Sequence, residues 1–319
     1  MDLPTMLDAD TQELTASWSG TVTPYVVGDP GRAATAVVER LARDAPDHHG
    51  TVLDGAVVRP DDEAPWTHVR GASVRGLRHR QDGVVRQDEY CFRQTADDRY
   101  LVVAVADGVS AGSLSHEAAG VAARFGCEIV GDWLGQCEVS ELPWEHVLKT
   151  LSDLVVQRGR AVLRRRRVSV DDWSEGAFGE ALATTLVLAV VDLRPDDGSY
   201  RVEVVRVGDS SAWVHGAAGG WRSLHGLKND SEVIASSATA ALPQVTSFES
   251  ESYRVAAGDL LVLMTDGVSD PLGDGDGDFG RFLSEVWATP PSVTAFGAQV
   301  DFARKTFDDD RTAVAVWLG

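Results

Sequence analysis

The stretch Tyr100–Gly108 (YLVVAVADG) is an apolar run that ends in an aspartate and a glycine. Its apolar part is too short for a typical helix and rich in valine, which favours a strand buried on both faces. The stretch Asp259–Gly267 (DLLVLMTDG) repeats the design. In each, the glycine lets the chain turn sharply and leaves its carbonyl open to a ligand. The two stretches therefore predict two buried strands, which deliver Asp107 and Asp266 at their ends.

Apolar runs separated by turn residues continue along the rest of the chain. Helical periodicity marks Ser115–Leu134 and Trp144–Arg167. Strand patterns mark four further segments: Thr184–Asp192, Tyr200–Val207, Ser211–His215 and Thr312–Leu318. Many hairpin-linked strands with two long helices predict an α+β fold, in which two packed antiparallel sheets are flanked by helices.

The chain has 319 residues, which is long for one core and short for two full domains. Its segment Ala45–Pro65 is rich in Asp, Pro, Gly and His, a composition typical of a loop or linker. We therefore expect an N-terminal extension with a linker over residues 1–65 and a catalytic domain over residues 66–319.

The formal net charge of −20 argues against two classes of partner. Binding to nucleic acid needs an excess of Lys and Arg to displace counterions, and so does binding to an anionic membrane surface. The three cysteines follow no zinc or disulfide spacing. Because residues 1–11 lack a signal-peptide pattern and no apolar run could span a bilayer, the expected location is the cytoplasm.

Two more aspartates lie beside strand-like runs. Asp309 comes just before the last strand, and Asp88 lies within Arg86–Tyr90 (RQDEY). Carboxylates that converge repel one another unless a cation compensates them. Oxygen ligands without a His/Cys cluster select hard cations such as Mg²⁺ or Mn²⁺, and two such ions can activate a water toward a phosphoryl group. A single Asp-Gly is more often only a turn, so the joint pattern carries the metal hypothesis.

Six segments, taken in order, resemble motifs of the protein phosphatase 2C family of metal-dependent phosphatases. They are RQDEY, VADGVSAG, ALATTLVLAVV, VGDSSAWV, VAAGDLLVLMTDGVSD and DDRTAVAV. The segment GASVRGLRHRQDGVVRQDEY is similar to the opening of the bacterial branch, and the resemblance covers Arg70 to Gly319. It implies a four-layer α-β-β-α sandwich that holds two Mn²⁺ or Mg²⁺ ions. It also implies signalling by hydrolysis of phosphoserine and phosphothreonine in proteins, through a hydroxide bridging both ions, opposing a Ser/Thr kinase.

The resemblance also implies roles for individual residues. Asp107 would bridge both metals, and the carbonyl of Gly108 would bind one of them. Asp88 would act mainly through a water on the first metal. Asp266 and Asp309 would complete the shell of that metal.

Within the run Asp308–Asp310, the resemblance selects Asp309, because the metal aspartate of the family lies three residues before the Ser/Thr that opens the final strand. That residue is Thr312 here. Asp209, in Gly208–Ser210, is expected to hold a turn.

Two parts of the family site are less well defined in this sequence. Glu180 stands where many members have an aspartate for a third metal, and its longer side chain predicts a weak third site. The phosphate-binding group of the substrate site is left open among Arg78, His79 and Arg80, which are close together in the sequence. An arginine fits a phosphate because its fork donates two hydrogen bonds.

Other interpretations compete with an active phosphatase. The chain could be a catalytically silent phosphatase-like module that binds a phosphopeptide or a partner. Gly108–Gly112 matches the G-x-S-x-G elbow of serine hydrolases, although their late histidine is lacking, since the last histidine is His225. Residues 274–285 match the acid spacing of an EF-hand without its glycine, so a solvated acidic loop is expected there.

Overall fold

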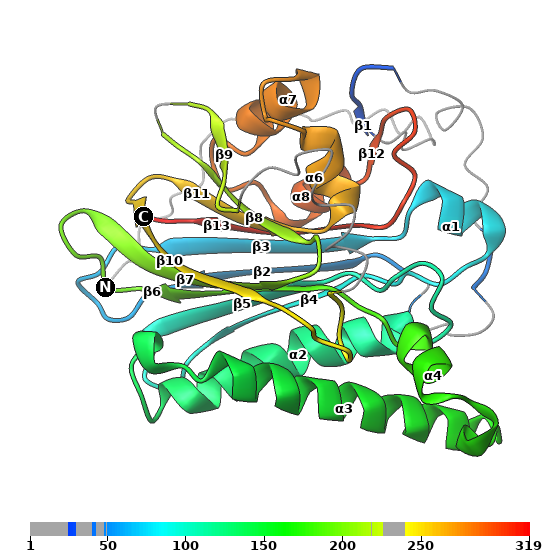
Figure 1. The fold of residues 1–319 in the computed structure, drawn as a ribbon. Coiled ribbons are helices and arrows are strands. Elements are labelled where there is room, and N and C mark those ends of the chain that lie inside the picture. Colours follow the sequence, from blue (N-terminus) through cyan, green and yellow to red (C-terminus); the bar gives the residue numbers. More distant parts are fainter. Residues whose placement is uncertain (1–24, 30–39, 43–47, 49, 218, 226–239) are drawn as a thin grey trace, which may run out of the picture.

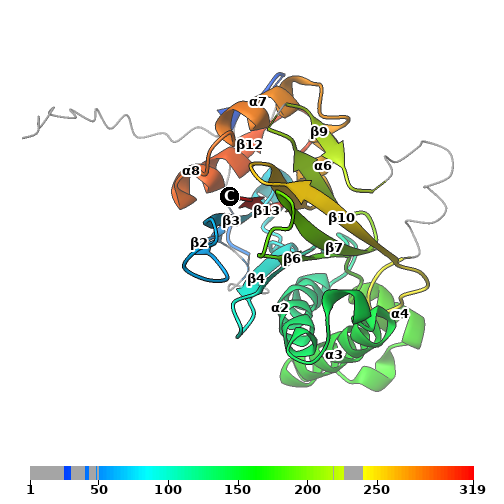
Figure 2. The ribbon, with the colours of Figure 1, turned by 90° about the vertical axis from the view of Figure 1, so that its left-hand side faces the viewer.

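The computed structural model describes residues 25–29, 40–42, 48, 50–217, 219–225 and 240–319. Two antiparallel sheets are stacked face to face in this part of the chain, and helices cover both outer faces (Figure 1 and Figure 2). The helices on one side are α2 (Ser115–Leu134) and α3 (Trp144–Arg165). Those on the other are α6 (Asp266–Leu272), α7 (Asp278–Val286) and α8 (Val293–Val300). This arrangement confirms the predicted α+β four-layer sandwich.

In each sheet, several strands that are neighbours in space are also consecutive in the sequence, as in hairpins. The five-stranded sheet has the order β10 (Glu249–Ala256), β7 (Ser199–Val207), β6 (Leu186–Asp192), β5 (Tyr100–Ala106) and β4 (Glu89–Gln94). The six-stranded sheet has the order β2 (Val52–Val58), β3 (Thr67–Val74), β13 (Arg311–Trp317), β11 (Leu260–Met264), β8 (Ser211–His215) and β9 (Trp221–Ser223). The short strands β1 (Tyr25–Val26) and β12 (Phe302–Ala303) pair in parallel.

The remaining helical segments are short. They are α1 (Leu77–Asp82), η2 (Val139–Glu141), η3 (Val170–Asp172) and α4 (Glu175–Ala181). Among the described residues, no helix has both the length and the apolar composition needed to cross a bilayer.

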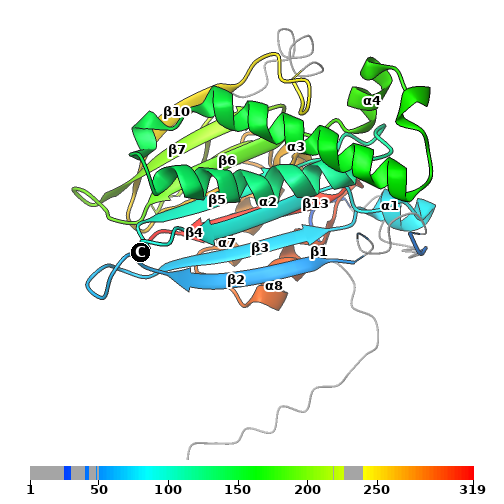
Figure 3. The same cartoon turned by 90° about the horizontal axis from the view of Figure 1, so that it is seen from below.

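Strand β5 shows why its sequence is apolar at every position. Val103 and Val105 face the other sheet, whereas Val102 and Ala104 pack under the helical layer of α2 and α3. Figure 3 shows these two helices lying across that sheet. Because both faces of the strand are buried, an alternating pattern would have placed polar groups in a core. The predicted strand Tyr100–Ala106 is confirmed residue for residue.

The expectation of a loop or linker over Ala45–Pro65 is wrong for Val52–Val58, which forms β2. This strand pairs antiparallel with β3, from Val52 opposite Ser73 to Val58 opposite Thr67. It lies at the edge of the sheet with most of its residues exposed, and it carries Asp54 and Gly55, so no apolar alternation marks it. The six-stranded sheet therefore begins before Trp66, where the main domain was expected to start.

We predict that Gly71→Ala lowers the free energy of unfolding by about 1–3 kcal/mol, because it overpacks the space between the sheets. A Cβ at Gly71 in β3 would collide with the ring of Tyr90 in β4, whose hydroxyl donates to the carbonyl of Gly71 at 3.3 Å. Urea unfolding measures the change. The matched control is Gly131→Ala in α2, where a Cβ meets nothing within 4 Å. That control should gain about 0.5–1 kcal/mol, and equal effects of the two substitutions would contradict this packing.

Candidate metal centre

Four strand ends bring the predicted metal aspartates to one end of the sandwich. Asp107 directly follows β5 and Asp88 directly precedes β4, and the antiparallel register places these two ends together. In the other sheet, Asp266 begins α6 after β11, and Asp309 lies just before β13. The register of β11 with β13 again places both ends together. Each sheet therefore contributes two carboxyl groups.

The carboxyl groups meet across the gap between the sheets. That of Asp107 lies within hydrogen-bonding reach of those of Asp88 and Asp266. Asp88 is only 2% exposed, and its Oδ2 accepts a hydrogen bond from Thr265 Oγ1 at 2.8 Å. Asp309 acts on Asp266 through its charge. The structure thus brings all four residues to one centre, with Asp88 at its buried side.

Without a bound cation, the negatively charged form of these carboxyl groups is unfavourable. Burial raises the pKa of Asp88 well above its usual range, and the charge of Asp310 adds to this. Burial and the charge of Asp88 do the same to the pKa of Asp107. Burial and the charge of Asp209 raise the pKa of Asp266 to about 6. A hard divalent cation bound by these carboxylate oxygens would offset their unfavourable negative charge. The donor set therefore fits Mg²⁺ or Mn²⁺.

The backbone around Gly108 is too tightly packed for any other residue. A Cβ at this position would lie 2.8 Å from the carbonyl oxygen of Gln87 and 2.8 Å from the carbonyl carbon of Ser115. The amide of Gly108 donates to the carbonyl of Gln87 at 3.2 Å. This crowding holds the Asp107 loop against the segment that carries Asp88. The role of the Gly108 carbonyl as a ligand stays a prediction.

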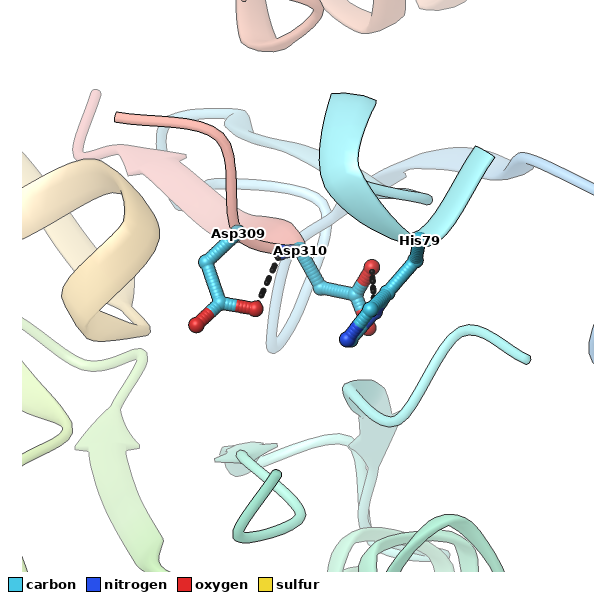
Figure 4. A group of neighbouring side chains, drawn as sticks. All are labelled: His79, Asp309 and Asp310. Carbon is cyan, nitrogen blue, oxygen red and sulfur yellow. Dashed lines mark hydrogen bonds and ion pairs between the residues drawn. The ribbon is translucent and has the colours of Figure 1, made fainter. Parts of the chain in front are cut away.

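Asp310 holds together three groups beside the centre, and the sequence pattern did not single it out. Its Oδ1 accepts from the amide of Gly76 at 2.6 Å and contacts His79 Nδ1 at 2.9 Å (Figure 4). Its Oδ2 accepts from the amide of Gln87 at 2.6 Å. Figure 4 shows the Asp309 carboxylate pointing away from this pair. The run of three acids was a signal, but sequence cannot tell which member points inward.

His79, Asp309 and Asp310 offer ligand atoms within 4.8 Å of one another, which a metal could also use. Since the Asp310 carboxylate already has three donors, Asp309 is the better ligand of the pair. Burial acts to lower the pKa of His79, but the hydrogen bond and charge of Asp310 outweigh it and raise that pKa. His79 therefore lies beside the carboxyl cluster, and its surroundings favour the protonated form of its imidazole.

The three predicted phosphate-binding residues occupy different environments. His79 is buried next to Asp309 and Asp310. Arg80 is also buried, and its Nη2 forms an ion pair with Asp301 at 2.8 Å. Arg78 is exposed on α1. Of the three residues, His79 therefore lies next to the carboxyl cluster, whereas Arg80 is already paired with a carboxylate of the protein.

Glu180 and Asp209 line a cavity of about 650 Å³ beside the centre, together with Thr185 and Val109. Asp209 was expected only to hold a turn, yet its charge raises the pKa of both Asp107 and Asp266. A Gly-Asp-Ser turn directly after a strand was the available signal. The predicted weak third site at Glu180 thus has a second carboxylate on the same cavity wall.

The serine-hydrolase interpretation gains no support from the geometry. Within the described residues, no hydrogen bond joins Ser110 to a histidine, and His225 lies 3.6 Å from the carboxylate of Glu249.

Comparison with known proteins gives a family and a fold. The family model described as Protein phosphatase 2C matches residues 75–299. Among solved structures, a bacterial serine phosphatase is 13% identical with a TM-score of 0.51, covering 79% of this chain and 97% of that one. RsbX in complex with magnesium is 12% identical with a TM-score of 0.49, covering 84% of this chain and all of that one (100%).

The phosphatase Stp1 from Staphylococcus aureus is 11% identical with a TM-score of 0.49, covering 84% of this chain and 94% of that one. A search of the curated proteins gives no match. At 13% identity the bacterial serine phosphatase supports the fold, and the family model carries the assignment.

We predict that Asp107→Asn stabilises the metal-free protein and abolishes its stabilisation by metal. The amide removes a buried charge that Asp88, Asp266 and Asp209 oppose, which should add on the order of 1 kcal/mol in EDTA. It also removes a ligand, so Mn²⁺ should no longer raise the melting temperature as it does for the wild type.

Thermal unfolding in EDTA and in Mn²⁺ measures both effects. The control is Asp132→Asn on the exposed face of α2, which should change neither. A wild-type protein that Mn²⁺ and Mg²⁺ both fail to stabilise would show that these carboxyl groups do not form a metal centre.

Proposed function

The chain belongs to the protein phosphatase 2C family, and from that premise we propose that it hydrolyses phosphoserine and phosphothreonine in proteins, using Mn²⁺ or Mg²⁺. The observation that carries this proposal is the meeting of Asp88, Asp107, Asp266 and Asp309 from four strand ends. A family member that had lost its activity would be expected to have lost part of this set. All four are present here and converge.

The chain's own residues hold and orient the reactants. Asp107 and Asp266 offer carboxylate oxygens between the sheets, and Thr265 fixes the rotamer of Asp88 from behind. When bound, two divalent cations supply the charge that lowers the pKa of an attacking water and offsets that of the phosphoryl group. Glu180 and Asp209 are our candidates for a weak third ion on the cavity wall.

His79 is our candidate for contacting the substrate phosphate. Its imidazole lies beside Asp309, Asp310 holds its Nδ1, and its raised pKa favours the cation. This arrangement matches a ring oriented by one nitrogen so that the other is free to donate. Arg78, exposed on the same helix, remains a second candidate, whereas Arg80 is engaged by Asp301.

We further propose that the protein opposes a Ser/Thr kinase in a signalling pathway, with phosphoproteins as its partners. The three free cysteines suit a reducing compartment, so we propose the cytoplasm as its location.

We predict metal-dependent turnover of p-nitrophenyl phosphate and of a phosphothreonine peptide. Mn²⁺ or Mg²⁺ should support it and EDTA should abolish it. Asp107→Ala and Asp266→Ala should each lower kcat by a factor on the order of 10² or more, because each removes a carboxylate from the metal centre. Asp132→Ala serves as the matched control and should retain full activity.

The alternative is a silent module that binds phosphopeptides or a partner without turnover. Folded wild-type protein that binds Mn²⁺ yet hydrolyses neither substrate would establish that alternative. Turnover that resists EDTA would exclude the proposed chemistry.

We predict that His79→Gln raises KM for the phosphopeptide more than it lowers kcat, since it removes a cation and keeps a hydrogen-bonding side chain. Steady-state kinetics at saturating Mn²⁺ separates the two parameters. Arg80→Gln provides the contrast, because it breaks a structural ion pair and should lower the melting temperature with KM unchanged. A raised KM in Arg80→Gln alone would transfer the phosphate-binding role to Arg80.

A further inference from the structure

A second pocket lies on the side of the first turns of α2, apart from the carboxyl cluster. Its volume is about 230 Å³. Its walls come from α2, from α3 and from His48, and the residues that matter here are His48, His116, Glu117, Arg124 and Arg158. None of these belongs to the proposed catalytic set.

Two imidazoles in this pocket carry a buried ring nitrogen without a hydrogen-bond partner among the described residues. The atoms are Nδ1 of His48 and Nε2 of His116, and His116 is only 2% exposed. Nε2 of His116 lies 3.9 Å from Oε1 of Glu117, beyond hydrogen-bonding distance. The two rings meet edge to face, with centroids 5.0 Å apart. A buried polar nitrogen left unpaired costs about 1–3 kcal/mol, so these two atoms favour a hydrogen-bonding partner in the pocket, either a water or a ligand.

Arginines give the pocket its charge. Arg158 donates to the Glu117 carboxylate from Nε at 2.9 Å, and its Nη2 lies 2.8 Å from the same oxygen. Arg124 pairs through Nη2 with Glu89 at 3.2 Å. In each case a guanidinium nitrogen, Nη1, has no acceptor among the described residues. Both side chains are partly solvent-exposed, at 47% for Arg158 and 67% for Arg124, so their free edges can turn toward a ligand.

The local charge favours an anion over a cation. The lining contains two arginines, Arg124 and Arg158, and one carboxylate, Glu117. The positive charges of Arg86 and Arg166 also act on the two histidines, and the negative charge of Glu89 opposes them. Burial lowers the pKa of His116 to about 4, so its ring is neutral and carries one N–H that can donate. In a chain of net charge −20, this is a cationic pocket of the kind that reads phosphate groups.

We propose that this pocket is a second phosphate-binding site, in which Arg124, Arg158 and the imidazole N–H of His116 hold a phosphate group. The group is either free phosphate or a second phosphorylated residue of a protein bound at the metal centre. Binding of free phosphate does not depend on the proposed hydrolysis, because none of these residues belongs to that centre, whereas binding of a second phosphorylated residue rests on the proposed function.

The first test measures binding of inorganic phosphate to EDTA-treated full-length protein by calorimetry, in the Asp107→Asn background so that the metal centre contributes nothing. Saturable binding is expected. It should weaken about tenfold or more in Arg124→Gln and in His116→Phe, because each removes a donor to a charged ligand. The control is Arg160→Gln, an exposed arginine of α3 outside the pocket, which should bind as before.

The second test separates the two sources of phosphate. With active protein, KM is compared for a singly and a doubly phosphorylated peptide. A lower KM for the doubly phosphorylated peptide, lost in Arg124→Gln, identifies a substrate group as the ligand. An equal KM for both, together with phosphate binding in the first test, identifies free phosphate.

Three outcomes would overturn the proposal. The first is no phosphate binding by the folded protein. The second is binding that Arg124→Gln and His116→Phe leave unchanged. The third is binding of Zn²⁺ that persists in Asp107→Asn and disappears in His116→Phe, which would identify a cation site. Because the first test needs no turnover, failure of this proposal and failure of the phosphatase proposal can be told apart.

Discussion

Electrostatic repulsion among carboxyl groups that two rigid sheets force together is the constraint on which the rest of this structure depends. Asp88 and Asp107 come from one sheet and Asp266 and Asp309 from the other. Strands β5, β11 and β13 pair with a neighbour on both sides, and the edge strand β4 pairs with β5, so the hydrogen-bonded backbone holds these groups close together. Burial, together with this repulsion, raises the pKa of Asp88, Asp107 and Asp266 in the metal-free protein. A bound divalent cation would offset the repulsion, so the packing that holds these carboxyl groups together would favour metal binding.

Asp310 couples this centre to its surroundings. One carboxylate side chain bonds the entrance of α1, the ring of His79 and the amide before Asp88. Three groups within residues 76–87 therefore share a single acceptor, which lies more than 200 residues further along the chain. A displacement of any of them would shift the others, so the orientation of His79 and the position of Asp88 depend on each other.

The sequence predicted those strands whose residues are all buried. β5 is buried on both faces and so reads as an unbroken apolar run, and its aspartate follows directly. β2 was missed because an edge strand with exposed residues has no such signature. Within the site, strand ends identified the convergent acids, but the inward direction of Asp310 and the engagement of Arg80 by Asp301 depend on contacts more than 200 residues apart along the chain. Residue spacing carries no information about such contacts.

The position of β13 has a consequence for synthesis of the protein. This strand lies between β3 and β11, with Asp309 just before it, so residues near 311–317 complete the interior of the six-stranded sheet. While the chain is still emerging from the ribosome, β3 and β11 each have an unpaired edge and the metal centre lacks a ligand. Sheets that close through such distant contacts fold late and expose aggregation-prone edges until they do. In a nascent chain, the facing edges of β3 and β11 would therefore stay unpaired until residues 311–317 have been made.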